Sequence, residues 1–214
     1  MLELGLKFTL AYLLGSVMGA LLVGWLRGGI DIRTMGSGNA GGTNALRTQG
    51  RGFAAGVMLV DVGKGILAVA IIPHLSLPFI GTDAAVDRDV VLHAVALGAI
   101  LGHVFPIWHE FRGGKGGATA AGLVLYLAPF LGLGVIGIWI AIVFFTGYVG
   151  LATMTATCAA ALWLAVFELP EQQALFVFAC LVAALTLFTH RANLGRMMRG
   201  EESRFKRFFG LGSG

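Results

Sequence analysis

The chain has little charge. Only 12% of its 214 residues are Asp, Glu, Lys or Arg, and 57% are hydrophobic. A typical soluble domain carries about 25% charged residues. The composition therefore excludes an ordinary soluble globular protein and predicts an integral membrane protein.

Cysteine is also scarce, since Cys158 and Cys180 are the two in the chain and both fall within apolar runs. A thiol in such a run behaves as a small hydrophobic group, and no CxxC or Cys/His spacing accompanies either one. His103 and His109 are six residues apart with Pro106 between them, so they do not share a helix face. We therefore expect no disulfide framework, no metal site and no cofactor.

The excess of positive charge is small, with a net charge of +4 and an isoelectric point near 9.4. The basic residues fall in the short connections between apolar runs, where positive charge sets membrane orientation. This placement does not favour a nucleic-acid partner.

Seven apolar runs approach the length of about 20 residues that a spanning helix needs. They cover residues 4–26, 53–72, 90–108, 118–131, 133–148, 151–167 and 175–188. The first is expected to be a retained helix, because Arg27 follows it and no small-residue cleavage pattern closes it. Residues 118–148 could instead form one broken span. We predict an all-α membrane protein of about seven helices, with residues 1–214 as a single domain.

The connections also predict the orientation of these helices. The first carries four arginines against one aspartate: Arg27, Arg33, Arg47 and Arg51 against Asp31. The third connection and the tail at residues 191–207 are basic as well. By the positive-inside rule these segments are cytoplasmic, which places the N-terminus outside and the C-terminus in the cytoplasm.

Glycine occurs inside the runs as two GxxxG pairs, Gly15 with Gly19 and Gly98 with Gly102. Small residues let membrane helices approach closely, so we expect both pairs to lie at helix contacts.

The first of three polar clusters contains residues 36–47, GSGNAGGTNALR. Taken alone, such a segment could be a solvated loop. Its many backbone N–H groups, its hydroxyl and amide side chains and its single guanidinium are also what an anion-binding nest requires.

The second cluster, residues 102–119, reads GHVFPIWHEFRGGKGGAT. It fails the GxxxxGK[ST] phosphate-loop pattern because Gly116 follows Lys115 and no strand precedes it. A lysine flanked by glycines before an apolar helix still offers a cation, backbone amides and a helix N-terminus to an anion.

The third cluster, residues 189–209, begins where the last run ends. Most of its basic residues are expected to meet anionic lipid head groups. His190, Asn193 and Arg196 are spaced to share one helical face and could reach inward.

Asp61 and Lys64, at i and i+3 in the second run, are expected to form an ion pair that neutralises two charges in an apolar helix. Such a pair could also complete a site beside a polar loop. Together the clusters suit a strongly anionic ligand with one or two phosphates. No Ser/His/Asp or GxSxG pattern offers a covalent nucleophile. A transporter of a phosphorylated solute and a lipid-binding scaffold remain the alternatives.

The segments GSGNAGGTNALR, DVGKG, GHVFPIWHEFRGGKGGAT and HRANLGR resemble, in order and spacing, the motifs of the bacterial acyl-phosphate:glycerol-3-phosphate acyltransferases, the PlsY family. The resemblance implies a seven-helix enzyme of the bacterial cytoplasmic membrane with its site at the cytoplasmic face. The implied reaction transfers a fatty acyl group from acyl phosphate to the sn-1 hydroxyl of glycerol 3-phosphate, a step of phospholipid biosynthesis. The products would be lysophosphatidate and inorganic phosphate.

Matching positions imply the site. The implied catalytic residues are Ser37, Arg47, Lys115, His190 and Asn193. The implied substrate-binding residues are Gly36, Asn39, Thr43, Asn44, Lys64, Gly113, Gly114, Gly116 and Arg196, with Asp31, Arg33, Asp61 and His103 in support. Three positions depart from the family: Ala40 replaces a frequent proline, Gly150 a common serine and Thr189 a common arginine. The proton of the attacking hydroxyl could pass to His190 or to the departing phosphate, and the absence of a carboxylate pair favours the phosphate.

Overall fold

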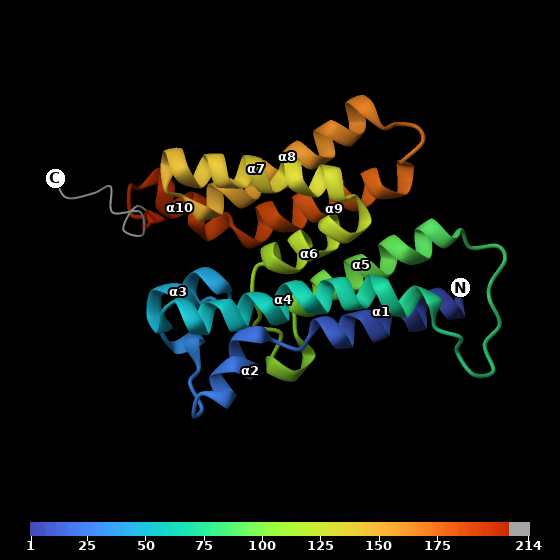
Figure 1. Cartoon of the computed structure of the whole chain (residues 1–214), viewed down its shortest axis with the longest axis horizontal. Helices are drawn as coiled ribbons and strands as arrows, with labels where there is room; N and C mark the ends of the chain where they lie inside the picture. The colour runs from blue at the N-terminus through green and yellow to red at the C-terminus, as the bar shows by residue number, and fades with distance from the viewer. Residues whose placement is uncertain (206–214) are drawn as a thin grey trace. The chain divides into compact units, whose positions relative to one another are not determined.

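A computed structural model describes residues 1–205, which contain α-helices and short 3-10 turns but no strand (Figure 1). Lys206 and Arg207, the end of the predicted basic tail, lie outside these residues. The chain divides into two compact units, residues 1–127 and the residues from 128 onward.

The first unit begins with two short helices, α1 (Leu2–Gly15) and α2 (Gly19–Leu26). A polar connection containing η1 (Ile32–Thr34) leads to the short helix α3 (Gly42–Gln49). The longer helices α4 (Arg51–Ile71) and α5 (Arg88–Val104) follow, with η2 (Ile72–His74) after α4 and η3 (Ile107–His109) after α5. The unit ends with α6 (Gly117–Leu127). Helix α5 packs on α1, and α4 packs on α6, α3 and α2.

The second unit contains α7 (Pro129–Thr146), α8 (Val149–Phe167), α9 (Gln173–Thr189) and α10 (Arg191–Met198). Helix α8 packs between α7 and α9, and the short α10 contacts both α8 and α9.

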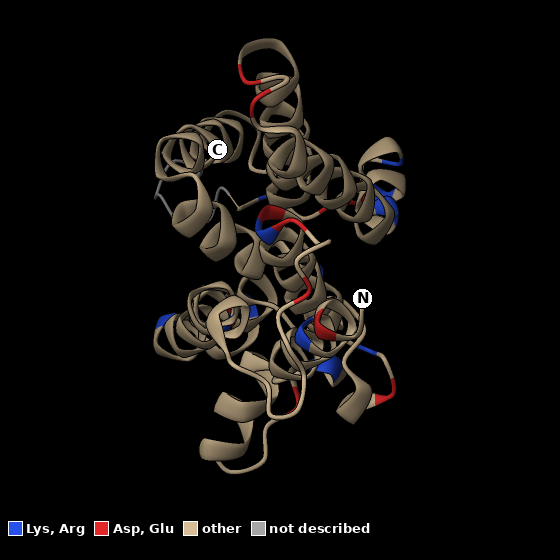
Figure 2. Ribbon diagram, turned by 90° about the vertical axis from the view of Figure 1, so that its right-hand side faces the viewer, with Lys and Arg blue, Asp and Glu red and all other residues tan. Residues whose placement is uncertain are grey.

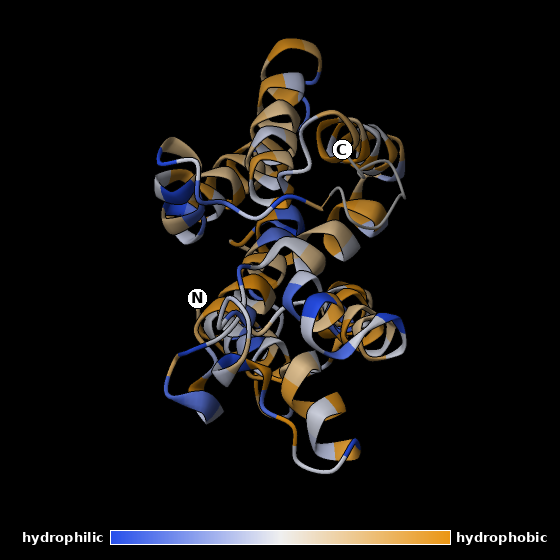
Figure 3. Cartoon of the chain, turned by 90° about the vertical axis from the view of Figure 1, so that its left-hand side faces the viewer, coloured by the Kyte–Doolittle hydropathy of each residue, from blue (hydrophilic) through white to orange (hydrophobic). Residues whose placement is uncertain are grey.

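All seven apolar runs predicted from the sequence are helical, which confirms the all-α membrane fold. By length and composition, four helices of the described chain can cross a membrane: α4 and α5, each with its 3-10 extension, α7 and α8. The count rises to six if α1 with α2, and α9 with α10, each form one bent span. Helix α6 is a shorter apolar helix. Hydrophobic residues make up much of the helical ribbon, and hydrophilic residues gather in shorter stretches (Figure 3).

Two details of the predicted spans are wrong. The run at residues 4–26 is not one helix, because α1 and α2 meet at a 42° bend. The break within residues 118–148 lies at Ala128 rather than at residue 132, since Pro129 occupies the first turn of α7. A proline is tolerated at the start of a helix but interrupts a helix interior.

Glycines mediate the packing of α1 on α5, as the sequence predicted. A Cβ built on Gly98 would lie 2.7 Å from the Phe8 carbonyl oxygen, and one on Gly102 would overlap the Tyr12 carbonyl oxygen. From the other side, a Cβ on Gly15 would overlap the backbone of Ala99. The two helices therefore touch through their backbones, an approach that larger residues would prevent.

Charged residues gather near helix ends and in connections, and long stretches of helix carry none (Figure 2). Glu3, in the first turn of α1, is a charged residue that is almost fully buried, at 5% exposed. Its carboxylate accepts hydrogen bonds from Lys7 Nζ at 2.8 Å, from Arg88 Nη1 at 2.8 Å and from the Asp83 backbone N–H at 2.9 Å. Lys7 also donates to the Pro73 carbonyl at 2.6 Å. This Glu3 cluster joins the start of α1, the connection after η2 and the start of α5.

Glu3→Gln is expected to lower the melting temperature of the purified protein. The substitution leaves the buried ammonium of Lys7 without its carboxylate partner, and a buried charge that loses its partner is strongly destabilising. Thermal unfolding in detergent measures the effect. Glu171→Gln, at an exposed position of the second unit, is the matched control and should leave the melting temperature unchanged. Equal melting temperatures for Glu3→Gln and the control would contradict a stabilising role for the cluster.

Candidate functional site

The first glycine-rich segment is shaped by the buried side chain of Asn44. Its Nδ2 donates to the Ile32 carbonyl at 2.9 Å and to the Met35 carbonyl at 3.0 Å. Its Oδ1 accepts from the Ser37 backbone N–H at 2.9 Å. Both amide hydrogens and the oxygen of Asn44 are thus bonded to backbone groups of the loop. This residue therefore fixes the loop's conformation from its buried side.

The same contact explains the glycine at position 36. Its φ is +57°, a left-handed value that favours glycine, and a Cβ there would overlap Asn44 Oδ1. Ser37 is exposed just after this turn, and Asn39 and Thr43 are half-buried. Arg47 is exposed on α3, one helical turn beyond Thr43.

Asp31 and Arg33 form a two-pronged ion pair at the entrance to this segment. Arg33 Nη2 lies 2.8 Å from Asp31 Oδ2, and Arg33 Nε lies 3.1 Å from both carboxylate oxygens. The hydrogen bonds from the Arg33 side chain lower the pKa of Asp31, and hydrogen bonding to Asp31 raises the pKa of Arg33. Because the folded-state pKa of Asp31 is depressed, the pair is intact at neutral pH and is lost only as the pH falls through that lowered value.

The second glycine-rich segment folds back on the end of α5. The Gly113 N–H donates to the Val104 carbonyl at 3.2 Å, and the Gly114 N–H donates to the His103 carbonyl at 3.1 Å. A Cβ on Gly113 would overlap the His103 carbonyl oxygen, so no side chain fits there. Lys115 is half-buried, Gly116 has a φ of +85°, and α6 begins at Gly117.

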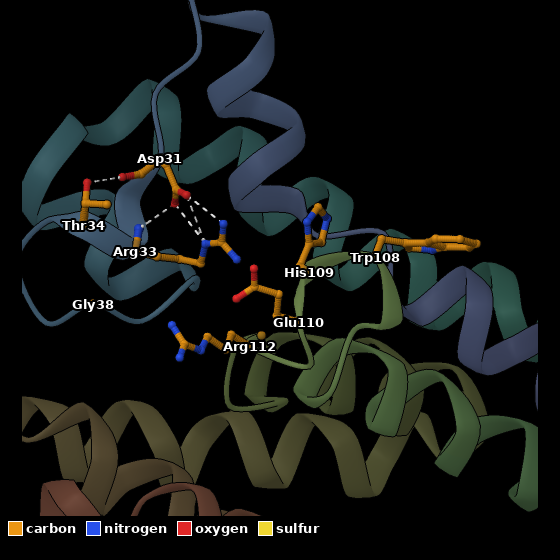
Figure 4. Close-up of a pocket in the computed structure, with 9 residues that line it drawn as sticks. Asp31, Arg33, Thr34, Gly38, Trp108, His109, Glu110 and Arg112 are labelled. Carbon is orange, nitrogen blue, oxygen red and sulfur yellow. Dashed lines mark hydrogen bonds and ion pairs between the residues drawn. The ribbon is translucent and has the colours of Figure 1, made fainter.

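Both segments contribute to one pocket of about 420 Å³ within the first unit. Gly38 of the first segment and Gly113 of the second line it, and the charged ends of Arg33, Glu110 and Arg112 converge on it (Figure 4). The remaining lining residues are Asp31, Thr34, Trp108 and His109. The structure thus brings together two segments that lie far apart in the sequence.

Residues 108–112 were not among the predicted site residues, although they belong to the second cluster. Their proximity to Gly38 depends on the fold, and spacing along the chain does not reveal it. The sequence did offer one signal for these residues, the charged Glu110 and Arg112 directly before the glycines.

Asp61 and Lys64 form the predicted ion pair, with Lys64 Nζ 3.0 Å from Asp61 Oδ1. Both side chains are buried in the first unit, and His103 of α5 lies against them. The structure therefore brings together three of the predicted residues, Asp61, Lys64 and His103.

The third group of predicted residues lies in the second unit, around α10. His190 Nδ1 is 2.9 Å from the Thr186 carbonyl oxygen, which makes Nδ1 the donor and leaves the ring's lone pair on Nε2. Asn193 Nδ2 donates to Glu202 Oε1 at 2.7 Å, and Arg196 Nε donates to Glu202 Oε2 at 2.7 Å. Sequence reasoning missed Glu202, although an acidic residue within a basic tail was a signal in the sequence; its burial is seen only in the structure.

The departures at positions 150 and 189 can now be placed. Gly150 packs on Asn193, since a Cβ there would lie 3.1 Å from Asn193 Cβ. A serine at this position would put its hydroxyl beside Asn193. The Thr189 hydroxyl donates to the Thr186 carbonyl at 3.1 Å, the same oxygen that His190 contacts.

Apolar spanning helices joined by polar, glycine-rich connections define an integral membrane protein. Comparison with known proteins gives the family: residues 6–200 match the family model described as glycerol-3-phosphate acyltransferase. The chain belongs to this family, the PlsY family, and is an acyltransferase of glycerol 3-phosphate.

Curated relatives of the same name match over nearly their whole length. The protein of Chlorobium phaeovibrioides is 37% identical over 95% of this chain and 97% of the relative. That of Nitrobacter winogradskyi is 41% identical, over 93% and 94% respectively. The crystal structure of PlsY (YgiH), an integral membrane glycerol 3-phosphate acyltransferase, in its glycerol 3-phosphate form is 32% identical with a TM-score of 0.81. That match covers 96% of this chain and 98% of that one.

Asn44→Ala is expected to destabilise the first glycine-rich segment. It removes the partners of two carbonyl groups and one N–H, and each buried group left unpaired costs about 1–3 kcal/mol. The melting temperature, measured by thermal unfolding, and the acyltransfer rate should both decline. Gln49→Ala is the control, because it removes a half-buried amide of the same helix whose contact, with Met35 Sδ at 3.3 Å, is exposed to solvent. Unchanged stability and activity in Asn44→Ala would contradict the assigned role.

Proposed function

We propose that the chain transfers a fatty acyl group from acyl phosphate to the sn-1 hydroxyl of glycerol 3-phosphate, releasing lysophosphatidate and inorganic phosphate. The observation that carries the proposal is the pocket in which Gly38 and Gly113, from the two glycine-rich segments, lie with Arg33 and Arg112. Family membership supports the acceptor. Solved structures of PlsY in a glycerol 3-phosphate form and a lysophosphatidic acid form support both the acceptor and the product.

The glycine-rich segments suit phosphate because each leads into a helix N-terminus. The first continues into α3 at Gly42 and the second into α6 at Gly117. The first N–H groups of a helix have no partner within it, and the helix dipole favours a negative charge there. Arg47 and Lys115 add full positive charges for charge-assisted hydrogen bonds. We assign phosphate binding to these segments, with Gly36, Asn39, Thr43, Gly114 and Gly116 as their other members.

The chemistry needs little beyond positioning and charge stabilisation. Acyl phosphate is already an activated mixed anhydride. The sn-1 hydroxyl oxygen attacks its carbonyl carbon, a new C–O ester bond forms, and the bond to phosphate breaks. Fixed donors such as Ser37 and Lys115 would stabilise the negative charge that develops on oxygen. No covalent acyl-enzyme is required.

The hydroxyl proton passes, in this proposal, to the departing phosphate. His190 is the competing acceptor, because its Nδ1–H donates to the Thr186 carbonyl and its Nε2 carries the lone pair. Arg196 and Asn193 are held by Glu202, so we assign Glu202 the role of orienting them.

We further propose that the protein resides in the bacterial cytoplasmic membrane as one functional domain. The basic connections orient it with its N-terminus outside, its C-terminus in the cytoplasm and the glycine-rich segments facing the cytoplasm. Termini on opposite sides require an odd number of crossings, so we take the shorter apolar helix α6 as a seventh crossing beside the six spans of the described chain. Acyl phosphate, glycerol 3-phosphate and membrane lipids are then its partners.

Purified protein in lipid, supplied with acyl phosphate and labelled glycerol 3-phosphate, should form labelled lysophosphatidate and phosphate. Lys115→Ala is expected to lower the rate about 100- to 1,000-fold, the usual cost of losing one charge-stabilising donor. Arg27→Ala, which removes an exposed cation from the first basic connection, should keep the wild-type rate. No product while the donor survives would refute the proposal, and uptake of unchanged solute by proteoliposomes would favour a transporter.

His190→Asn separates the two candidate proton acceptors. The asparagine amide can still donate to the Thr186 carbonyl, but Nε2 is gone. If the phosphate accepts the proton, turnover should fall by less than about 100-fold and its pH dependence should persist. If His190 is the base, the loss should reach about 100- to 10,000-fold, and the limb of the pH profile that reports the base should vanish.

A further inference from the structure

Lys64 lies in the interior of the first unit, where its side chain is 3% exposed. Its Nζ is 2.7 Å from the Val17 carbonyl oxygen, 2.9 Å from His103 Nδ1 and 3.0 Å from Asp61 Oδ1. An ammonium has three N–H donors and no acceptor. Its three donors therefore match these three contacts, and none remains for a substrate phosphate.

Two contacts bear on the protonation of His103: its Nδ1 lies 2.9 Å from Lys64 Nζ and 3.4 Å from Asp61 Oδ1. With Lys64 as an ammonium, which can only donate, Nδ1 is the acceptor of the shorter contact, and the proton of the neutral ring is on Nε2. The ring's Nε2 then has no lone pair with which to take a proton from a hydroxyl. This tautomer argues against His103 as a general base.

Asp61 connects the cluster to the bend between α1 and α2. Its Oδ1 accepts from the Gly19 backbone N–H at 3.1 Å, and Lys64 donates to the carbonyl of Val17 in the same bend. The bend leaves backbone groups without partners from a continuous helix, and in an apolar interior such groups need partners from elsewhere. The ion pair of α4 supplies them.

The other side of the cluster supports the second glycine-rich segment. A Cβ built on Gly114 would overlap His103 Nε2, so the imidazole packs directly against the Gly114 backbone. The Gly114 and Gly113 amides donate to the carbonyls of His103 and Val104. Gly114 does not have a positive φ, so contact with the ring, rather than backbone conformation, explains why it has no side chain.

We propose that Asp61, Lys64 and His103 are positioning residues for the phosphate-binding segment at residues 113–116. Lys64 fixes the tautomer and orientation of His103. The His103 ring, by direct contact, fixes the position of the Gly114 backbone. The inference rests on the proposed function and revises one part of it: Lys64 acts through the loop and does not contact substrate. Neutralisation of charge alone would require neither His103 nor its contact with Gly114.

A double substitution tests the contact between His103 and Gly114. Gly114→Ala is expected to lower kcat/KM for glycerol 3-phosphate about 100-fold, because its methyl group overlaps the ring and displaces the loop. His103→Asn keeps an acceptor for Lys64 but empties the space beneath Gly114, and should cost about 10- to 100-fold. In the double variant the methyl occupies the vacated space, so kcat/KM should recover at least about tenfold over Gly114→Ala. Additive losses would overturn the proposal.

Hydrogen exchange supplies a readout that does not depend on turnover. His103→Asn and Lys64→Met should speed exchange of the Gly113 and Gly114 amides while peptides from α7 and α8 keep their wild-type rates. His93→Asn, on the same helix α5, is the matched control and should change neither exchange nor kcat/KM. Histidine ¹⁵N labelling should find the His103 proton on Nε2, with a signal identified by its loss in His103→Asn.

Unchanged exchange in a folded His103→Asn variant, or a proton on Nδ1, would overturn the inference while leaving the acyltransferase function intact. Loss of one limb of the pH profile in His103→Asn with normal exchange would make His103 a base and also overturn it. Failure of the wild-type protein to make lysophosphatidate would instead refute the proposed function, and the exchange experiment would still report on the loop.

Discussion

The structure depends on one constraint: a polar group placed in an apolar interior is costly unless the protein supplies a partner. Water cannot satisfy such a group there, so an unpaired buried charge or a broken helix is costly. Among the described residues, Asp61 Oδ2 and Thr119 Oγ1 are buried without a hydrogen-bond partner, whereas the other Asp61 oxygen is fully used. The bend between α1 and α2 meets this constraint through Asp61 and Lys64 of α4. A charged pair in a spanning helix is unfavourable alone, and so is an interruption in the helix beside it. Here the pair gives the interrupted backbone its hydrogen-bond partners, and the backbone gives the pair polar contacts.

The same need for partners explains how the first unit holds irregular backbone next to its helices. The loop at residues 35–44 turns around a buried amide, and the loop at residues 113–116 rests on a buried imidazole. In both cases glycine lets the backbone come into direct contact with the supporting side chain. The exposed side of the first loop, where Ser37 lies, is thereby left for interactions with other molecules.

Much of the fold was predictable because the signals are local. Run length and hydropathy located the helices, and the GxxxG pairs marked positions of close helix contact without showing which helices meet there. The bend at residues 16–18 was not predictable, since no proline marks it and its stabilising groups come from α4. The break before Pro129 was placed four residues too late because hydropathy continues across it.

The residues of the candidate site were predictable as a set, but their individual tasks were not. Asn44, Lys64 and Arg196 read in the sequence as ligand donors. In the structure, the Asn44 amide donates to the Ile32 and Met35 carbonyls. Lys64 contacts Val17, Asp61 and His103, and Arg196 Nε donates to Glu202. Composition shows how many donors a motif holds, but only the packing around each donor shows whether the protein itself already uses it.

Burial therefore separates two kinds of cation within these motifs. Lys64 is enclosed, and its charge is balanced by a carboxylate, so it contributes no net attraction to an arriving phosphate. Lys115 is half-buried and Arg47 is exposed, and each belongs to one of the two glycine-rich segments. An anion that reaches these loops meets the second kind of cation, and in the loop at residues 113–116 the backbone beside it is the part that we propose Lys64 holds in place through His103. Preorganisation of this sort removes the cost of rearranging the loop during the reaction, which is how fixed donors accelerate transfer from an already activated acyl group.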